Sequence, residues 1–202
     1  MSNTIEAEAV IGNLVMAVNM LENCSEFTAL IPEVRVNLAY ALNDAMTSED
    51  VDAVEGRITA VRGFPRASGL PNWGASDHLA RRILEVRKYD AKINAALNFK
   101  SNESIVDIVQ QYCAERGLVC GYVDRSKEPY DAAKDDGTSM PWKVEQLFSK
   151  YGAIPRLFHE GPGWGKEPLF LVLGRDAVEV TEIAIEIARR YRKTRLKDDL
   201  SS

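Results

Sequence analysis

The chain has 202 residues, a length typical of one globular domain with its own hydrophobic core. Hydrophobic residues make up 46% of it and charged residues 27%, and the net charge of −5 argues against a general nucleic-acid-binding surface. Three cysteines without a CxxC pair, an N-terminus without a basic signal region and the lack of an apolar run near ~18 residues favour a cytoplasmic protein with no membrane span.

Hydrophobic periodicity predicts alternating helices and strands. In chain order we expect a helix over 6–21, a strand over 34–41, a hairpin formed by 57–61 and 65–69, a helix over 78–89, a strand over 93–99, a helix between 102 and 117, a strand over 118–123, a helix over 138–151, a strand over 169–173 and a helix over 176–192. The polar stretch 125–137 is predicted to be a loop.

These elements predict one α/β domain with helices on both faces of a mixed sheet. The first helix, within 1–24, would pack on a domain spanning 25–192, and 193–202 would form a charged, frayed tail. The strand–helix–strand succession over 93–123 indicates a right-handed crossover if its strands are parallel neighbours.

A glycine-rich loop occupies positions 161–167, GPGWGKE. It is not a P-loop, because Glu167 stands where Ser or Thr would bind magnesium and a predicted strand follows. The backbone N–H groups of Gly163 and Gly165, with Lys166, can nevertheless hold a phosphate. The alternative is a surface turn with a solvated lysine.

The segment 56–81 combines arginines, glycines and one of only two histidines. Two histidines far apart in the sequence make a zinc–histidine site improbable. His78 lies near a predicted helix start, where its ring can reach an anion beside the helix dipole or can simply be half-exposed next to a cap. Arg57 can clamp a phosphate or can be solvated. No GxSxG motif is present, so Ser76 and Ser139 are interpreted as cap or phosphate-contact residues.

Two carboxylates, Asp135 and Asp136, precede the predicted helix at 138. Carboxylates can hold Mg²⁺ together with the phosphates of a substrate. These two residues are therefore candidate magnesium ligands, with Asp124 and Glu167 as further candidates. The alternative is a solvated acidic loop.

Five segments of the chain can be compared with known families: IPEVRVNLAYAL (31–42), EGRIT (55–59), GASDHLAR (74–81), GTSMPW (137–142) and GKEPLFLVLGRDAVEV (165–180). Together they resemble the ThiN-type thiamine-phosphate synthase domain, in the order and spacing of that family. The resemblance covers about 25–190 and implies a three-layer α/β/α fold of the class II aldolase/epimerase type, with a mixed, mostly antiparallel sheet that would overrule a simple parallel crossover. Neither the kinase nor the helix-turn-helix module that often precedes this domain is found, so we expect a stand-alone form.

The resemblance implies that hydroxymethylpyrimidine diphosphate condenses with hydroxyethylthiazole phosphate, giving thiamine phosphate and diphosphate, with Mg²⁺ as cofactor. The critical arginine and histidine of the family match Arg57, as a phosphate or diphosphate clamp, and His78, as a partner of the departing diphosphate. The other substrate-binding candidates are Arg35, Asn37, Ser76, Ser139, Gly163, Gly165 and Lys166, whereas Arg62, Arg66 and Arg82 are interpreted as ordinary surface.

The resemblance also leaves an alternative function. Regulators in the family use the same domain to sense thiamine phosphate, and this chain would then be a ligand-binding domain without its own DNA-binding module. Both functions need phosphorylated small molecules as partners, and neither needs direct contact with nucleic acid or membrane. A homodimer is left open.

Overall fold

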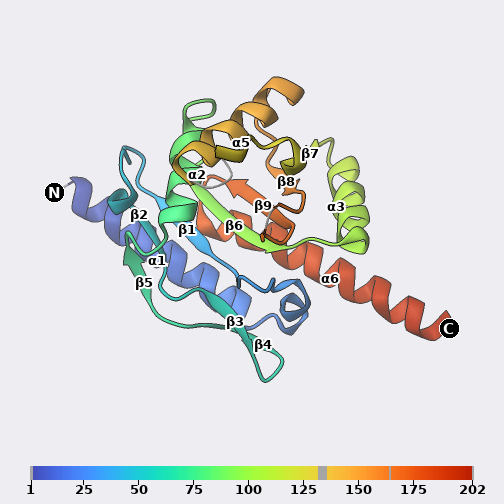
Figure 1. Ribbon diagram of the computed structural model, residues 1–202. Coiled ribbons are helices and arrows are strands. Elements are labelled where there is room, and N and C mark those ends of the chain that lie inside the picture. Colours follow the sequence, from blue (N-terminus) through green and yellow to red (C-terminus); the bar gives the residue numbers. More distant parts are fainter. Residues whose placement is uncertain (1, 132–135, 164, 202) are drawn as a thin grey trace.

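A computed structural model describes residues 2–131, 136–163 and 165–201. Its main sheet has seven strands in the order β5-β2-β1-β6-β9-β8-β7 (Figure 1). Neighbouring strands are antiparallel except for β7 and β8, which are parallel. The strands are β1 (Leu38–Ala41), β2 (Val51–Val54), β5 (Pro71–Trp73), β6 (Ala95–Lys100), β7 (Cys120–Val123), β8 (Leu157–Glu160) and β9 (Leu169–Gly174), and a separate hairpin consists of β3 (Ile58–Val61) and β4 (Phe64–Ala67).

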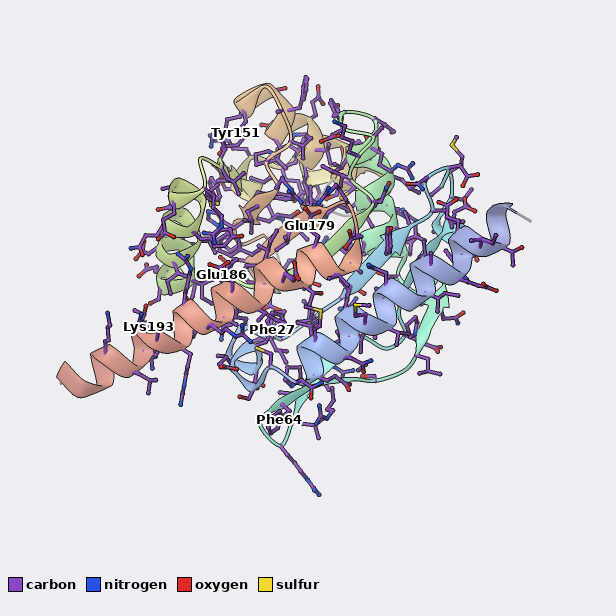
Figure 2. The ribbon with its side chains drawn as sticks, turned by 180° about the vertical axis from the view of Figure 1, so that it is seen from behind. Phe27, Phe64, Tyr151, Glu179, Glu186 and Lys193 are labelled. Atoms are coloured by element: carbon purple, nitrogen blue, oxygen red, sulfur yellow. The ribbon has the colours of Figure 1, made fainter. Side chains whose placement is uncertain are left out.

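Helices cover both faces of this sheet, so the domain has three layers, α/β/α. Helices α2 (Asp77–Arg87) and α5 (Asp136–Tyr151) pack on one face. The other face is covered by α1 (Ser2–Glu22), α3 (Glu103–Glu115) and α6 (Ala177–Ser201). Figure 2 shows α1 and α6 side by side across this face. The three-layer architecture and the mixed, mostly antiparallel sheet are therefore confirmed.

The alternation of side chains along β6 separates the two cores. Leu97 and Phe99 point to the face under α6, where Phe99 stacks on Phe170 of β9 with ring centroids 5.1 Å apart. Ala96 and Asn98 point to the opposite face. Ala96 continues a row of small side chains through β1 and β2, and this row allows α2 to approach the sheet closely. Asn98 places a polar group at the end of the same face.

The predicted helix ends agree with the observed caps. Ser76 caps α2 by accepting a hydrogen bond from the Leu79 N–H at 3.3 Å. Asn102 caps α3 in the same way. Gly117, with φ +63°, follows the end of α3.

The structure corrects several of the sequence predictions for strands. The strand expected over 34–41 begins only at Leu38, because Arg35 has φ +67° and breaks the extended backbone. The short strands β2, β5 and β8 were not predicted. The crossover from β6 to β7 does not join neighbours, since β9 and β8 lie between them.

Two helices are longer than predicted. The last one, α6, continues to Ser201, so residues 193–201 are helical rather than frayed, and its last turns project beyond the domain (Figure 1). Helix α5 begins at Asp136 and carries Pro141 inside it. The predicted loop 125–137 begins with a 3₁₀ turn, η3 (Arg125–Lys127), in which Arg125 is buried.

Helix α1 is long and apolar enough over Thr4–Glu22 to cross a membrane, which differs from the sequence expectation. Its residues Leu14, Ala17 and Leu21 are fully buried in the core. Only 28% of this stretch is buried, and Ile5, Ile11, Val15 and Met16 are exposed. Packing therefore accounts for one face of the helix but not for the apolar side chains on its other face.

A carboxylate is buried inside the sheet. Asp52 of β2 is fully buried between Tyr40 and Trp73 of the neighbouring strands, and its oxygens accept no hydrogen bond of ordinary geometry from the described residues. Burial raises the pKa of Asp52 to about 6. The folded state therefore holds a proton between pH 4 and 6 that the unfolded chain has lost, and stability falls as the pH rises through this window.

We expect Asp52→Asn to raise the free energy of unfolding by up to about 3 kcal/mol at pH 8, because the amide removes a buried charge. At pH 4 the gain should be small. Urea unfolding at both pH values measures this difference, with the exposed Asp44→Asn as control. The same change in the free energy of unfolding at pH 4 and pH 8 would contradict a raised pKa of Asp52.

Candidate active site

A cavity of about 250 Å³ lies between the sheet, helices α2 and α5, and the glycine-rich loop. It opens where β6 and β8 end, and the turn after β2 contributes to its rim. Among the described residues, the charged and titratable side chains that line it are five cations, one histidine and two carboxylates: Arg57, Arg82, Arg125, Lys143, Lys166, His78, Glu160 and Glu167. This excess of positive charge suits an anionic ligand.

Arg57 stands in a strained turn at the rim of the cavity. Gly56 and Arg57 both have positive φ values, +68° and +71°, and they connect β2 to β3. A left-handed conformation costs a non-glycine residue roughly 1–2 kcal/mol. The Arg57 side chain is exposed and donates a hydrogen bond from Nη1 to the Val34 carbonyl at 2.5 Å. The strained turn thus places a guanidinium at the pocket entrance.

Three polar side chains tie the sheet to the start of α2. The Asn37 backbone N–H donates to Oδ1 of Asn98 at 2.6 Å, and the Asn37 side-chain amide donates to Oγ of Ser76. Oδ1 of Asn37 is buried and accepts no hydrogen bond from the described residues. Because Asn37 lines the cavity, this oxygen is available to accept from a ligand N–H group.

Helix α2 presents two functional groups to the cavity. His78 and Arg82 are four residues apart, so they share one face of the helix, and both line the cavity. Arg82 is fully buried, with its guanidinium 5.7 Å from the ring centroid of Phe158. The expectation that Arg82 is ordinary surface is therefore wrong, whereas Arg62 and Arg66 are exposed as expected.

Glu160, the last residue of β8, lies at the centre of the buried charges. Its carboxylate is 2.5 Å from Nη2 of Arg82, 3.2 Å from Nζ of Lys143 and 4.0 Å from Nη1 of Arg125. Burial alone would raise the pKa of Glu160, but Arg82, Lys143, Arg125 and His78 together lower it to about 2. Glu160 is therefore ionised near neutral pH.

The glycine-rich loop closes over this group. Gly163 and Lys166 exchange backbone hydrogen bonds of 3.1 Å, and Gly165 has φ +62°. A Cβ atom at Gly163 would lie 2.7 Å from Cζ of Arg125, so only glycine allows the guanidinium to approach the loop this closely. Glu167 fixes the other side of the loop by accepting hydrogen bonds from the backbone of residues 33 and 34.

The structure brings most of the predicted site residues together. The cavity is lined by Arg57, His78, Asn37, Gly165 and Lys166, and two further candidates lie next to it. Ser76 accepts a hydrogen bond from the side chain of Asn37, and Gly163 packs against the guanidinium of Arg125.

Other candidates lie away from the cavity. Arg35 lines a separate, shallower hollow next to Arg57. Ser139 is buried and donates its hydroxyl to Glu128, so it supports the charged groups from behind. Asp135 lies outside the described residues, as does the side chain of Asp136.

The described residues do not supply a dedicated magnesium site. Among them, no group of three His, Cys, Asp or Glu side chains converges. Both carboxylates of the cavity are engaged, Glu160 with cations and Glu167 with backbone N–H groups. Asp124 accepts a hydrogen bond from the backbone N–H of Ser126 and forms an ion pair with Lys127.

Sequence reasoning missed Arg82, Lys143, Arg125 and Glu160. The positions of two of them on their helices could have indicated burial. Arg82 lies on the apolar face of its helix, with Leu79, Ile83 and Val86. Lys143 lies in the same way among Met140, Val144 and Leu147. A charged residue on the buried face of a helix requires a buried partner. That partner, Glu160, lies in a strand that was not predicted.

Comparisons with known proteins identify the family of this chain. The family model of thiamine-phosphate synthase ThiN matches residues 13–186. The thiamine-phosphate synthase ThiN of Methanothermobacter thermautotrophicus is 41% identical over 189 residues, which cover 94% of this chain and 96% of that protein. The bifunctional thiamine biosynthesis protein ThiDN of Methanocaldococcus jannaschii is 33% identical over 93% of this chain and 42% of its own length.

A solved structure, the C-terminal domain of phosphomethylpyrimidine kinase, superposes with a TM-score of 0.84 at 31% identity and covers 91% of this chain and all of that chain. It supports the order of layers described above. The family model spans most of this chain, and the relative from Methanothermobacter thermautotrophicus is matched over nearly its whole length. The chain therefore belongs to the thiamine-phosphate synthase ThiN family.

Proposed function

We propose that this cavity is the active site in which the chain, a thiamine-phosphate synthase, joins hydroxymethylpyrimidine diphosphate to hydroxyethylthiazole phosphate. The observation that carries the proposal is that Arg57 and His78, 21 positions apart in the sequence, line one cationic cavity together with Lys166. Both substrates carry phosphate groups, and a cavity with excess positive charge favours them over neutral molecules.

The reaction needs charge neutralisation more than proton transfer. The neutral thiazole nitrogen uses its lone pair to form a bond to the pyrimidine methylene carbon. The bond from this carbon to the diphosphate oxygen breaks, and its electron pair leaves with the diphosphate. The nitrogen carries no proton to be removed, so no general base is required, and cations that stabilise the leaving group lower the barrier.

Each residue at the rim then has a role. Arg57, which projects from its strained turn, clamps a phosphate group at the entrance. His78 lies close enough to Glu160 to lower its pKa, and it donates a hydrogen bond or proton to the departing diphosphate. Lys166 and the glycine-rich loop hold the phosphate of the thiazole.

Asn37 suits the pyrimidine. The substrate ring carries an amino group, and Oδ1 of Asn37 is a buried acceptor without a partner among the described residues. A hydrogen bond from the amino group to this oxygen would satisfy it and would orient the ring. Such an acceptor distinguishes an aminopyrimidine from an analogue that lacks the amine.

We propose Mg²⁺ as a cofactor that enters with the diphosphate, since the described carboxylates of the cavity are already engaged. The free thiols of Cys24, Cys113 and Cys120 are consistent with the proposed cytoplasmic location. The proposed partners are the two phosphorylated substrates.

The direct test is an activity assay. Purified protein is incubated with both substrates and Mg²⁺, and thiamine phosphate and diphosphate are quantified by chromatography. We expect the two products in a one-to-one ratio. Tight binding of thiamine phosphate without any turnover would instead assign the chain to the sensing domains.

A further inference from the structure

Arg82, the most deeply buried cation among the described residues, lacks hydrogen-bond partners for its donors. Arg82 is fully buried, and Nε, Nη1 and Nη2 find no acceptor of hydrogen-bond geometry among the described residues. The 2.5 Å approach of Nη2 to Glu160 is an electrostatic contact without hydrogen-bond alignment. Leaving a buried guanidinium unsatisfied is costly. Because Arg82 lines the cavity, an anionic ligand with several oxygen atoms can satisfy these donors.

Two further buried cations converge on the same place from other elements. Lys143 of α5 is 1% exposed and Arg125 of η3 is 7% exposed, and both line the cavity. Burial lowers the pKa of Lys143, although Glu160 opposes this effect. Helix α2, helix α5 and η3 thus each contribute one cation to this group, which we call the cation cluster: Arg82, Lys143 and Arg125.

The carboxylates that the structure describes near the cluster do not balance its charge. Glu160 contacts all three cations, and Glu128 pairs with Arg125 at 3.3 Å. Both carboxylates are almost fully buried, with side-chain exposures of 5% and 2%. Among the side chains that the structure describes, three cations against two carboxylates leave one positive charge uncompensated in a low-dielectric site. Such an arrangement is unfavourable without an additional anion.

We propose that the cation cluster, held in place by Glu160, is the binding site of the diphosphate group of one substrate, an inference that rests on the proposed function. A diphosphate offers more charge and more acceptor atoms than a monophosphate, and the cluster offers three cations, of which Arg82 has donors without a hydrogen-bond partner among the described residues. His78 precedes Arg82 by one helical turn. A leaving group bound to the cluster therefore lies within reach of the histidine assigned to it.

Glu160 is a positioning residue in this site. Its pKa of about 2 keeps it ionised, so it cannot exchange protons with substrate near neutral pH. It is held by three cations and orients their side chains before the ligand arrives. Preorganised cations of this kind act on the leaving group without reorganisation during the reaction.

The test measures the binding of inorganic diphosphate, the probe, by titration calorimetry, with inorganic phosphate as a second probe. We expect Lys143→Met, which keeps the length of the side chain and removes its charge, to weaken diphosphate binding by roughly 10- to 100-fold. The matched control is Lys150→Met on the exposed face of the same helix. Arg125→Gln provides a second variant, and circular dichroism establishes which variants are folded.

Steady-state kinetics separate the two substrates. We expect the KM for the pyrimidine diphosphate to rise in Lys143→Met and Arg125→Gln, while the KM for the thiazole phosphate stays the same. Diphosphate binding like that of the wild type, or a KM change confined to the thiazole phosphate, would overturn the proposal. A purely structural role of the cluster would not shift one KM alone.

A failure of the diphosphate-site proposal can be distinguished from a failure of the proposed function. A wild-type protein that makes no thiamine phosphate, yet binds diphosphate in a way that depends on Lys143, would overturn the proposed function and support the diphosphate site. A protein that makes thiamine phosphate, yet binds diphosphate equally well in the Lys143→Met variant, would support the proposed function and overturn the diphosphate site.

Discussion

Arg57→Ala and His78→Ala are each expected to lower kcat by roughly 100- to 1,000-fold, the usual effect of removing one preorganised contact to a charged reacting group. The fold should survive, because Arg57 is exposed and His78 only half-buried. Circular dichroism and thermal unfolding check the fold, and the chromatographic assay of thiamine phosphate gives kcat and KM.

Matched variants make this prediction specific. Arg62→Ala removes an exposed arginine that also has positive φ but lies in the β3–β4 turn, away from the cavity. His159→Gln removes the other histidine, whose ring lies tilted against that of Tyr122 and which lines a groove on the opposite face of the sheet. We expect near wild-type turnover from both controls. Wild-type turnover in Arg57→Ala and His78→Ala would show that the reaction takes place elsewhere.

Glu160→Gln is expected to lower the free energy of unfolding by about 3–5 kcal/mol at pH 7, because it leaves three buried cations without their shared counter-ion. Urea unfolding measures the change. The exposed Glu145→Gln on α5 serves as control and should stay within about 0.5 kcal/mol of the wild type. Equal stability of Glu160→Gln and wild type would contradict the structural account of the charged group.

The same residue predicts an acid-dependent loss of stability. The pKa of Glu160 is lowered from 4.5 to about 2 by the surrounding cations. The carboxylate therefore stabilises the folded state above pH 4.5, and this contribution is lost as the pH falls from 4.5 towards 2. The stability difference between wild type and Glu160→Gln should shrink over this range.

The sequence predicted the elements that carry strong periodicity. Helices α1, α2, α3 and α6 and the six-residue strands β6 and β9 have apolar faces long enough to identify them. Strand β5 has only three residues, and β2 and β8 four each, so no period can be established over them. They form because neighbouring strands supply their hydrogen-bond partners, and this depends on the tertiary structure.

The rim of the site was easier to predict than its interior. Arg57 and His78 lie in segments that resemble a known family, so they could be assigned from the sequence. Arg82, Lys143 and Glu160 are separated by up to 78 positions, and their burial is determined by how α2, α5 and β8 pack. A charged residue on an apolar stripe indicates a buried ion pair, but the sequence alone does not identify its partner.

The most direct measurement is a crystal structure of the protein with inorganic diphosphate and thiamine phosphate bound. The account predicts both ligands in the cavity between α2, α5 and the sheet, with the diphosphate in contact with Arg82 and Lys143 and the thiamine phosphate near Arg57. Ligands bound instead in the groove beside Tyr122 and His159, on the opposite face of the sheet, would contradict it.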